Sequence, residues 1–232
     1  MPAERFFIPG PLQAHQEVLL EGSEFHHLIH VMRLEAGERA EIVNGQGILA
    51  QGVLKRREKK QAVFLIESIA HEEKSPREII LAQALPRINR LDFIIEKGTE
   101  LNATQFWLFP GQLSERRSLT EHQLERLQSL TVAAMKQCGR LFLPSILVKP
   151  TLDKWENLGL PSFFGDLRAS APAFLQVQDA NASSLFFVGP ESGFTDKEIE
   201  RLDKLGATGV KLHSNILRTD TAALVALSIM SQ

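Results

Sequence analysis

The stretches FFVGPESGF (residues 186–194) and LHSNILRTDTAALVALSIM (residues 212–230) decide the fold of this chain. The apolar run LFFV at residues 185–188 predicts a strand that is buried on both faces. A Gly-Pro turn follows the strand. Thr195, with Glu198 three residues later, then forms a capping box, which predicts that a helix begins here.

The chain after this helix repeats the order of strand, loop and helix. Gly206 is expected to end the first helix, and a short strand at residues 208–212 follows. An irregular loop then leads to a second helix, which Thr219 and Asp220 open; it is apolar on nearly every side, so we expect it to be buried. Two such units side by side place two backbone loops at the carboxyl ends of parallel strands, where open α/β sheets bind ligands. The sequence therefore predicts a pocket between the loops.

The predicted pocket lacks the loops that bind nucleotide phosphates. The turn GPESGF does not have the glycine positions of the dinucleotide fingerprint, and no G-x-x-x-x-G-K-[ST] occurs in the chain. A phosphate-binding loop is therefore disfavoured.

Both stretches resemble the RsmE family of ribosomal RNA methyltransferases, in the SPOUT superfamily. Residues 189–194 match the family's G-P-E-x-G-F loop, and residues 216–222 match its I-L-R-T-[ED]-T-A segment. The resemblance implies an α/β fold with a parallel sheet, in which these loops belong to a deep trefoil knot that holds S-adenosylmethionine in a bent shape. Periodicity does not predict the knot, because knots are very rare among folds.

We expect S-adenosylmethionine to be held largely by backbone groups, because the edges of adenine pair well with main-chain N–H and C=O groups in an apolar slot. The expected walls are the end of a strand at residues 162–167, the turn at residues 189–193, and residues 212–219. The predicted cofactor-binding residues are Gly189, Pro190, Glu191, Gly193, Leu212, Ile216, Leu217, Arg218 and Thr219.

The chain departs from the family pattern at three places. Ser192 stands where the family generally has glycine, which restricts the turn if this position needs a positive φ. The tripeptide HSN at residues 213–215 replaces a G-P-R-like stretch, so one side of the pocket is expected to differ. Asn102 follows the matching segment KGTEL (residues 97–101), where the family usually continues with glycine.

The resemblance implies methyl transfer to N3 of a uridine in 16S ribosomal RNA. That nitrogen loses its proton only well above neutral pH, so the enzyme must stabilise the uridine anion or remove the proton as the methyl arrives. The predicted catalytic residues are Arg218, inside the second motif, and Arg5, which aligns with an arginine in the family's N-terminal segment. Each also has a structural interpretation: Arg5 as an exposed charge on a first strand, and Arg218 as the ion-pair partner of Asp220 or Glu191.

Two other functions remain open. The same fold and cofactor could serve methylation of another RNA position, such as a ribose 2′-hydroxyl of transfer RNA. The chain could also be a ribosome-binding protein without catalytic activity. The resemblance also implies a homodimer. For the uridine-N3 methyltransferase, it implies 16S rRNA or the small ribosomal subunit as the partner.

The composition favours a soluble, cytoplasmic protein. The chain has 232 residues with 44% hydrophobic composition, and it contains no apolar run as long as a membrane span and no signal-peptide core. Cys138 is its only cysteine, which excludes an intramolecular disulfide and a thiolate metal cluster; its helical spacing predicts a core position. The net charge of -2 is not typical of a nucleic-acid binder, so RNA contacts must come from local clusters.

Clusters of basic residues supply the candidate RNA contacts. The densest is KRREKK at residues 55–60, which equally fits a solvated hairpin end between two strands. The predicted RNA-binding residues are Arg5, Arg33, Lys55, Arg56, Arg57, Arg116 and Arg117.

Two domains are predicted: a PUA-like β-barrel at residues 1–72, named from the resemblance, and the methyltransferase domain at residues 73–232. The polar segment HEEKSPRE (residues 71–78) separates them. Beyond it, strands alternate with helices, as in a parallel sheet covered on both faces. A small barrel is favoured by short strand candidates at residues 5–8, 18–20, 39–44, 47–54 and 61–69, with NGQG as a hairpin turn.

Capping residues predict the start of two helices outside the motifs. Ser23 is expected to cap a helix in the first domain, whose His26 and His30 lie one turn apart; with no third ligand at a recognisable spacing, we predict no metal site. Thr120 with Gln123 caps a longer helix at residues 121–138.

Overall fold

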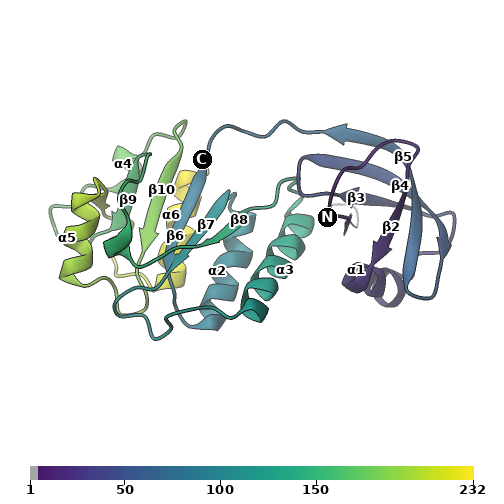
Figure 1. The fold of residues 1–232 in the computed structure, drawn as a ribbon. Helices are drawn as coiled ribbons and strands as arrows, with labels where there is room; N and C mark the ends of the chain where they lie inside the picture. The colour runs from purple at the N-terminus through teal and green to yellow at the C-terminus, as the bar shows by residue number, and fades with distance from the viewer. Residues whose placement is uncertain (1–4) are drawn as a thin grey trace. The chain divides into compact units, whose positions relative to one another are not determined.

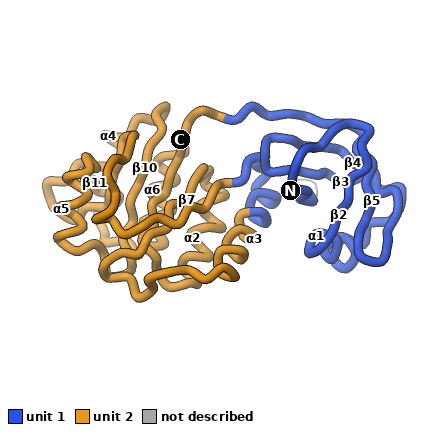
Figure 2. Tube along the Cα trace, in the orientation of Figure 1, with its two compact units in different colours: residues 1–74, 132–143 blue, residues 75–131, 144–232 orange. Residues whose placement is uncertain are grey.

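The computed structural model describes residues 5–232, which form two compact units (Figures 1 and 2). The first unit takes in the chain up to Lys74 together with residues 132–143, and the second takes in residues 75–131 and 144–232. Helix α3 (Glu121–Cys138) is divided between them after Thr131. Each unit has a hydrophobic core of its own.

The second unit is built on a six-stranded parallel sheet with the strand order β11-β9-β10-β6-β7-β8. The strand predicted from LFFV lies at its centre, pairs with β6 and β9, and is buried along its whole length. The strands are β6 (Ile79–Ala84), β7 (Gln105–Phe109), β8 (Ser145–Val148), β9 (Ser162–Gly165), β10 (Ser184–Val188) and β11 (Thr208–Val210).

Helices cover both faces of this sheet (Figure 1). α2 (Ile88–Glu100) and α6 (Thr219–Met230) pack on the face that carries Phe186, together with the short helix α4 (Phe174–Val177). α5 (Asp196–Lys204) and the 3-10 turn η2 (Leu152–Lys154) pack on the face that carries Phe187. Because successive strand residues point to opposite faces, one apolar run supplies both cores. The predicted covered parallel sheet is confirmed.

The connection from β11 to α6 brings the two motifs together. β11 lies at an edge of the sheet, whereas α6 contacts β6 and β10 near its centre and packs on α2. Residues 212–217 must therefore lead back across the carboxyl ends of the strands, where they line one cavity with residues 189–194.

Two of the predicted helix caps are present in the structure. The hydroxyl of Thr195 accepts a hydrogen bond from the backbone N–H of Glu198, whose carboxylate accepts one from the N–H of Thr195. The same reciprocal pair joins Thr120 and Gln123 at the start of α3. Each pair satisfies N–H groups that have no partner inside the helix, which explains why the local sequence predicts the start correctly.

The first unit is built on a five-stranded sheet with the order β1-β3-β4-β5-β2. β1 pairs with β3 in parallel, and the other pairs are antiparallel. Two register shifts between β4 and β5 mark bulges, which help the sheet to curl around its core. The strands are β1 (Arg5–Phe7), β2 (Glu17–Glu21), β3 (Arg39–Val43), β4 (Ile48–Arg57) and β5 (Gln61–His71).

The predicted cap at Ser23 is wrong. α1 (Gly22–His27) already includes Ser23, its N-cap is Glu21 without a side-chain hydrogen bond, and it continues into a π-helical turn, η1 (Leu28–Met32). The carboxylate of Glu24 accepts instead from the N–H of Phe7, at 2.8 Å, and from Lys136, at 2.5 Å. Contacts to distant segments therefore set this helix start.

The predicted core position of Cys138 is also wrong, because the side chain is exposed. Cys138 is the last residue of α3, and the chain leaves the helix at Gly139 with a φ of 89°. Within residues 5–232, no helix combines the length and apolarity needed to cross a membrane.

Candidate active site

A cavity of about 800 Å³ lies at the carboxyl ends of β9, β10 and β11. Its walls come from residues 165–168, 189–194 and 212–217, the segments that follow these three strands. Of the nine residues predicted to bind the cofactor, all except Arg218 line the cavity. Apolar side chains, among them Phe186, Ile199 and Leu212, supply much of its surface. The arrangement is an apolar slot edged by backbone groups, which suits a flat aromatic ring such as adenine.

The turn at residues 189–194 is shaped by two glycines. A Cβ atom on Gly189 would lie 3.0 Å from the carbonyl carbon of Gly193 and 3.1 Å from the nitrogen of Phe194, so the chain doubles back tightly. Gly193 has a φ of 76°, and its N–H donates to the carbonyl of Pro190 at 2.9 Å. The departure at Ser192 does not strain the turn, because the non-glycine residues with positive φ within residues 5–232 are His15, Arg33 and Asn102.

The departure at Asn102 is also compatible with the fold. Asn102 has a φ of 71°, and asparagine is enriched several-fold among the non-glycine residues that adopt this left-handed conformation. The position thus needs positive φ, which explains why glycine is the usual residue of the family there.

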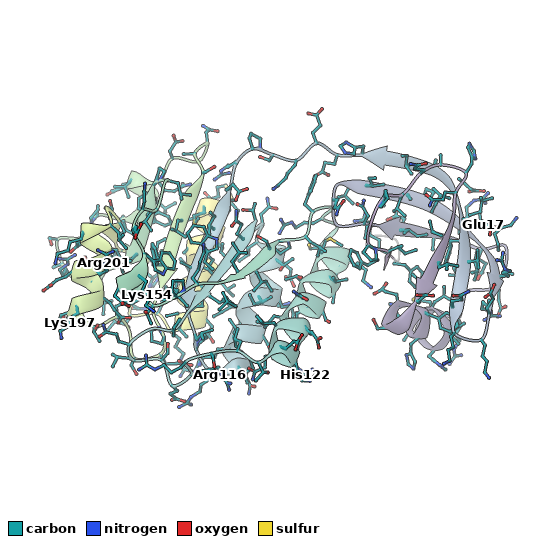
Figure 3. All side chains as sticks on the ribbon, viewed as in Figure 1. Glu17, Arg116, His122, Lys154, Lys197 and Arg201 are labelled. Carbon is teal, nitrogen blue, oxygen red and sulfur yellow. The ribbon has the colours of Figure 1, made fainter. Side chains whose placement is uncertain are left out.

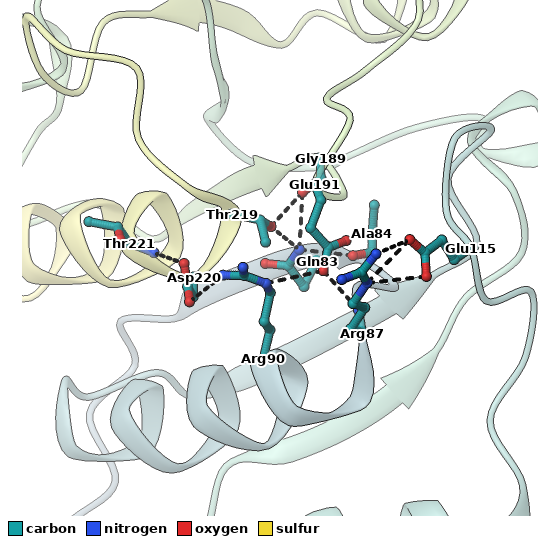
Figure 4. A network of polar contacts seen from close by, with 10 residues as sticks. All are labelled: Gln83, Ala84, Arg87, Arg90, Glu115, Gly189, Glu191, Thr219, Asp220 and Thr221. Carbon is teal, nitrogen blue, oxygen red and sulfur yellow. Dashed lines mark hydrogen bonds and ion pairs between the residues drawn. The ribbon is translucent and has the colours of Figure 1, made fainter.

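A buried glutamine joins the two motif turns (Figure 4). Gln83, in β6, is fully buried, and its Nε2 donates to the hydroxyl of Thr219 at 3.1 Å, to the carbonyl of Gly189 at 3.3 Å and to that of Ala84 at 2.8 Å. The Thr219 hydroxyl itself donates to the Gly189 carbonyl at 2.7 Å. Gln83 was not predicted as a site residue, although a glutamine in the apolar strand IILAQAL is a signal for a buried polar contact.

An arginine of α2 makes a second link between the turns. Nε of Arg90 lies 3.3 Å from a carboxylate oxygen of Glu191, and its Nη1 donates to Asp220 at 2.8 Å (Figure 4). The backbone N–H of Arg87 also donates to Glu191, at 3.0 Å, while the Arg87 side chain pairs with Glu115. Sequence analysis missed Arg90 as well, because its partners lie about one hundred residues or more along the chain.

Arg218 is left without either of its proposed structural partners. Its backbone forms the N-cap of α6, and its side chain is exposed. Arg90 holds both Asp220 and Glu191, and within residues 5–232 the Arg218 side chain has no ion-pair partner. The interpretation of Arg218 as an ion-pair partner of these acids is therefore wrong, and its guanidinium is available to a ligand.

Carboxylates edge the cavity on the side of α5 and β9. Asp196, Glu200 and Asp203 of α5 line it, as do Asp166, which follows β9, and Arg168, which pairs with Asp166. Burial by itself raises the pKa of Asp166, but hydrogen bonds from the side chain and backbone of Arg168 outweigh burial, so this pKa lies below its usual value. An acidic edge favours a cationic ligand such as a sulfonium. The residues present therefore fit S-adenosylmethionine in both shape and charge.

The structure places Arg5 and Arg218 in different units. Nε of Arg5 donates to Glu41 at 2.7 Å, the Arg5 side chain is only 11% exposed, and its Nη1 is buried without a hydrogen-bond partner within residues 5–232. The interpretation of Arg5 as an exposed charge is therefore wrong. Arg33, by contrast, is exposed and ends η1 with a φ of 55°.

The other residues predicted to bind RNA differ in whether their side chains already have partners within the protein. Arg56 pairs with Glu17 and Glu58, and Arg57 pairs with Glu35, whereas Lys55 is exposed. Arg117 donates to the carbonyls of Gly111 and Gln112, both at 2.9 Å, while Arg116 has no ion pair within residues 5–232. The cluster at residues 55–60 does lie at the end of the β4–β5 hairpin.

Two of the histidines in the first unit, His26 and His30, lie close together. The ring centroids of His26 and His30 are 4.3 Å apart. In the part of the chain that the structure describes, no three His, Cys, Asp or Glu side chains come together as metal ligands would.

Comparisons with known proteins agree with this fold and this site. The family model described as RNA methyltransferase domain matches residues 73–231, and the one described as RNA methyltransferase PUA domain matches residues 20–67. The ribosomal RNA small subunit methyltransferase E of Bacillus subtilis is 28% identical over 98% of this chain and 96% of its own length. That of Synechocystis is 31% identical over 91% of this chain and 71% of its own.

Solved structures match over almost the whole chain. A ribosomal RNA small subunit methyltransferase E from Neisseria gonorrhoeae, bound to S-adenosylmethionine, has a TM-score of 0.85 at 28% identity and covers 98% of this chain and 96% of its own. A methyltransferase from Legionella pneumophila, also with that cofactor, has a TM-score of 0.90 at 25% identity over 99% and 97%. The predicted fold class, a SPOUT-type parallel sheet with a PUA-like unit, is confirmed. Because the methyltransferase model spans more than half of the sequence and relatives match along its length, the chain belongs to the RsmE family of ribosomal RNA methyltransferases.

Proposed function

We propose that the protein transfers a methyl group from S-adenosylmethionine to N3 of a uridine in 16S ribosomal RNA of the small subunit. The observation that carries the proposal is the cavity between the two motif turns, whose acidic edge and apolar walls suit a sulfonium cofactor. Family membership supports the reaction class, since relatives along the whole chain are named as small subunit rRNA methyltransferases.

The cavity walls would hold the cofactor through the predicted residues of the two turns. The turn at residues 189–194 offers backbone N–H and C=O groups to the adenine, and Leu212, Ile216 and Leu217 offer apolar surface. Gln83 and Thr219 fix the distance between these walls. When bound there, S-adenosylmethionine would supply an electrophilic methyl carbon on a positively charged sulfur.

Arg218 would stabilise the uracil anion that attacks the methyl. As the N3–C bond forms, the C–S bond breaks and the N3 proton must leave, so negative charge on O2 and O4 has to be supported. A guanidinium about 4 Å from the anion supplies roughly 1 kcal/mol of electrostatic attraction in bulk water, and about 4 kcal/mol where the protein partly excludes water. An arginine side chain donates hydrogen bonds and does not accept them, so another group takes the proton.

The first unit would hold the RNA. Lys55 and Arg33 are exposed cations there, whereas Arg56 and Arg57 would have to exchange carboxylate partners for phosphates. We propose that Arg5 completes the RNA site or, from a second subunit, the catalytic one; its buried Nη1 has no partner within residues 5–232.

We further propose that the protein works as a homodimer in the cytoplasm, where ribosomal subunits are assembled. Association would cover exposed apolar side chains of the second unit, such as Phe93, which is 44% exposed.

The decisive experiment is mass analysis of digested rRNA from a deletion strain that is complemented with wild-type protein or Arg218→Ala. We expect N3-methyluridine to be absent from 16S rRNA without the gene, restored by the wild type and not by Arg218→Ala. Loss of a different methylated nucleotide, for example a 2′-O-methyl nucleotide of tRNA, would move the reaction elsewhere. Folded protein that binds rRNA but shows no calorimetric binding of S-adenosylmethionine would identify a non-catalytic binder.

A further inference from the structure

Arg90 bridges two carboxylates that belong to two different motif turns. Glu191 lies in the turn after β10, and Asp220 lies in the first turn of α6, yet one guanidinium from α2 contacts both, at 3.3 and 2.8 Å (Figure 4). All three side chains are partly buried, with 27%, 27% and 21% of their surface exposed. Such partly desolvated pairs are screened less than surface pairs.

The two carboxylates are the acids of the two motif stretches, and Arg218 lies in the second of them. Asp220 follows Arg218 by two residues, and Arg90 brings Glu191 to the same guanidinium as Asp220. Without Arg90, Asp220 would lose its only ion pair within residues 5–232, and Glu191 would keep only a longer-range attraction to the Arg87 guanidinium. Arg218, two residues before Asp220, carries an exposed guanidinium with no ion pair within residues 5–232, and this is the cation that we expect to replace Arg90.

No neighbour duplicates the contact that Arg90 makes. The side chain of Arg87, the N-cap residue of α2, forms its ion pair with Glu115. Glu191 keeps the Arg87 backbone N–H and a longer-range attraction to the Arg87 guanidinium, and Asp220 keeps the N–H of Thr221, but none of these contacts is an ion pair. The forked guanidinium presents a separate nitrogen to each acid, Nε to Glu191 and Nη1 to Asp220.

We propose that Arg90 is a positioning residue that keeps Arg218 free for the substrate base by holding both Glu191 and Asp220. This inference rests on the proposed function of Arg218 in methyl transfer. It predicts that, without Arg90, the freed carboxylates bind the Arg218 guanidinium and so disable it. Removing one of these carboxylates should then make Arg218 free again.

The first test measures whether Arg218 is free, without using catalysis. Arg218 in wild-type protein should react readily with a dicarbonyl reagent specific for arginine, as followed by peptide mass analysis. The reaction should slow in Arg90→Met and recover in Arg90→Met/Asp220→Asn. Equal rates at Arg218 in wild type and Arg90→Met would overturn the proposal whatever the reaction of the protein turns out to be.

The second test follows turnover at saturating cofactor and RNA, with the melting temperature measured in parallel. In Arg90→Met we expect kcat to fall by about tenfold or more, since misplacing a catalytic group can cost on the order of 10²-fold. The double variant should regain part of this loss. Arg87→Met removes an equal charge at the start of the same helix and should keep kcat within about twofold, because its ion-pair partner Glu115 is outside the bridge and its attraction to Glu191 is only a longer-range one.

The outcomes separate the two ideas. Failure of wild-type protein to methylate 16S rRNA would defeat the proposed function, while the labelling of Arg218 would still decide the role of Arg90. A fall in kcat for Arg90→Met that Asp220→Asn does not relieve, with Arg218 labelled at the wild-type rate, would mean that Arg90 has only a structural role.

Discussion

At the scale of single residues, Gly189 allows the first motif turn to close tightly because it has no Cβ atom. A Cβ atom added at Gly189 would lie 3.0 Å from the carbonyl carbon of Gly193 and 3.1 Å from the backbone nitrogen of Phe194. Backbone atoms cannot move aside as a flexible side chain would. We expect Gly189→Ala to destabilise the protein by about 1–3 kcal/mol, as overpacking does, and to open the turn. Calorimetry should then show that S-adenosylmethionine binds at least about tenfold more weakly, a difference of about 1.4 kcal/mol.

Gly165 provides the matched control for stability. It also lines the cavity, but it has no neighbour within 4 Å of an added Cβ and no positive φ. Chemical unfolding should show nearly wild-type stability for Gly165→Ala. A Gly189→Ala variant that is equally stable and binds the cofactor normally would refute this account of the turn.

Asp166 gives a prediction about acid stability. Burial raises the pKa of Asp166, but hydrogen bonds from Arg168 lower it by more than burial raises it, so the folded-state pKa lies below the unfolded one. Asp166 therefore stabilises the protein above the unfolded pKa of about 3.9, and this contribution is lost as the pH falls through the folded pKa. Because Arg168 is 58% exposed, solvent screening keeps the size at about 1 kcal/mol or less.

The measurement is the difference in unfolding free energy between wild type and Asp166→Asn as a function of pH. We expect this difference to be constant above about pH 5 and to shrink below about pH 4. A difference that does not change with pH would show that the carboxylate charge plays no part.

At the scale of elements, helix α5 carries its charges in two rows. Asp196, Glu200 and Asp203 line the candidate cofactor cavity, whereas Lys197, Arg201 and Lys204 line a second cavity of about 330 Å³. Figure 3 shows Lys197 and Arg201 extending from α5 near Lys154 of η2. The rows follow from helical periodicity, because residues three and four apart share a face. Sequence analysis missed this separation.

The acidic row should attract the cationic cofactor. In Glu200→Gln/Asp203→Asn, which spares the acidic residues that stabilise the helix N-terminus, we expect S-adenosylmethionine to bind about three- to tenfold more weakly at low salt. The loss should shrink at high salt, where exposed charges are screened. It should also be smaller for S-adenosylhomocysteine, which lacks the sulfonium charge.

The opposite row supplies the control for this element. Lys197→Gln/Lys204→Gln changes the same helix by the same number of charges on its other face, so cofactor affinity should stay near the wild-type value. Equal effects of the two double variants would mean that the net charge of the protein, and not the acidic row, governs binding.

At the scale of the whole molecule, cofactor and RNA binding are expected to use different units. The net charge of -2 gives no general attraction to RNA, so contacts must come from exposed cations such as Lys55. Lys55→Gln should raise KM for RNA and reduce the salt slope of RNA binding by about 0.7–0.9, the value for one lost phosphate contact. Calorimetric affinity for S-adenosylmethionine should not change.

Arg39→Gln is the control in the same unit, since Arg39 is an exposed arginine that pairs with Glu67. Its removal should leave the salt slope for RNA unchanged. If Lys55→Gln and Arg39→Gln alter the slope equally, or neither does, the hairpin end is a solvated surface and not an RNA contact.

The sequence by itself determined the features that depend on neighbouring residues. The capping box at Thr195, the buried strand β10 and the order of the two motifs were all predicted, because hydrogen bonds within one helix turn and side-chain alternation along one strand are local. The resemblance supplied the fold class that such signals could not. It also pointed to the residues of the cavity walls.

Only the tertiary structure decided which side chains meet across the chain. Gln83 reaches Thr219 over a separation of 136 residues, and Arg90 reaches Asp220 over 130, so no local pattern reports either contact. For the same reason the cap expected at Ser23 and the burial expected for Cys138 were wrong. The packing of distant segments, and not the propensity of the residues around them, sets these partners, and it is this packing that leaves Arg218 exposed beside the cavity.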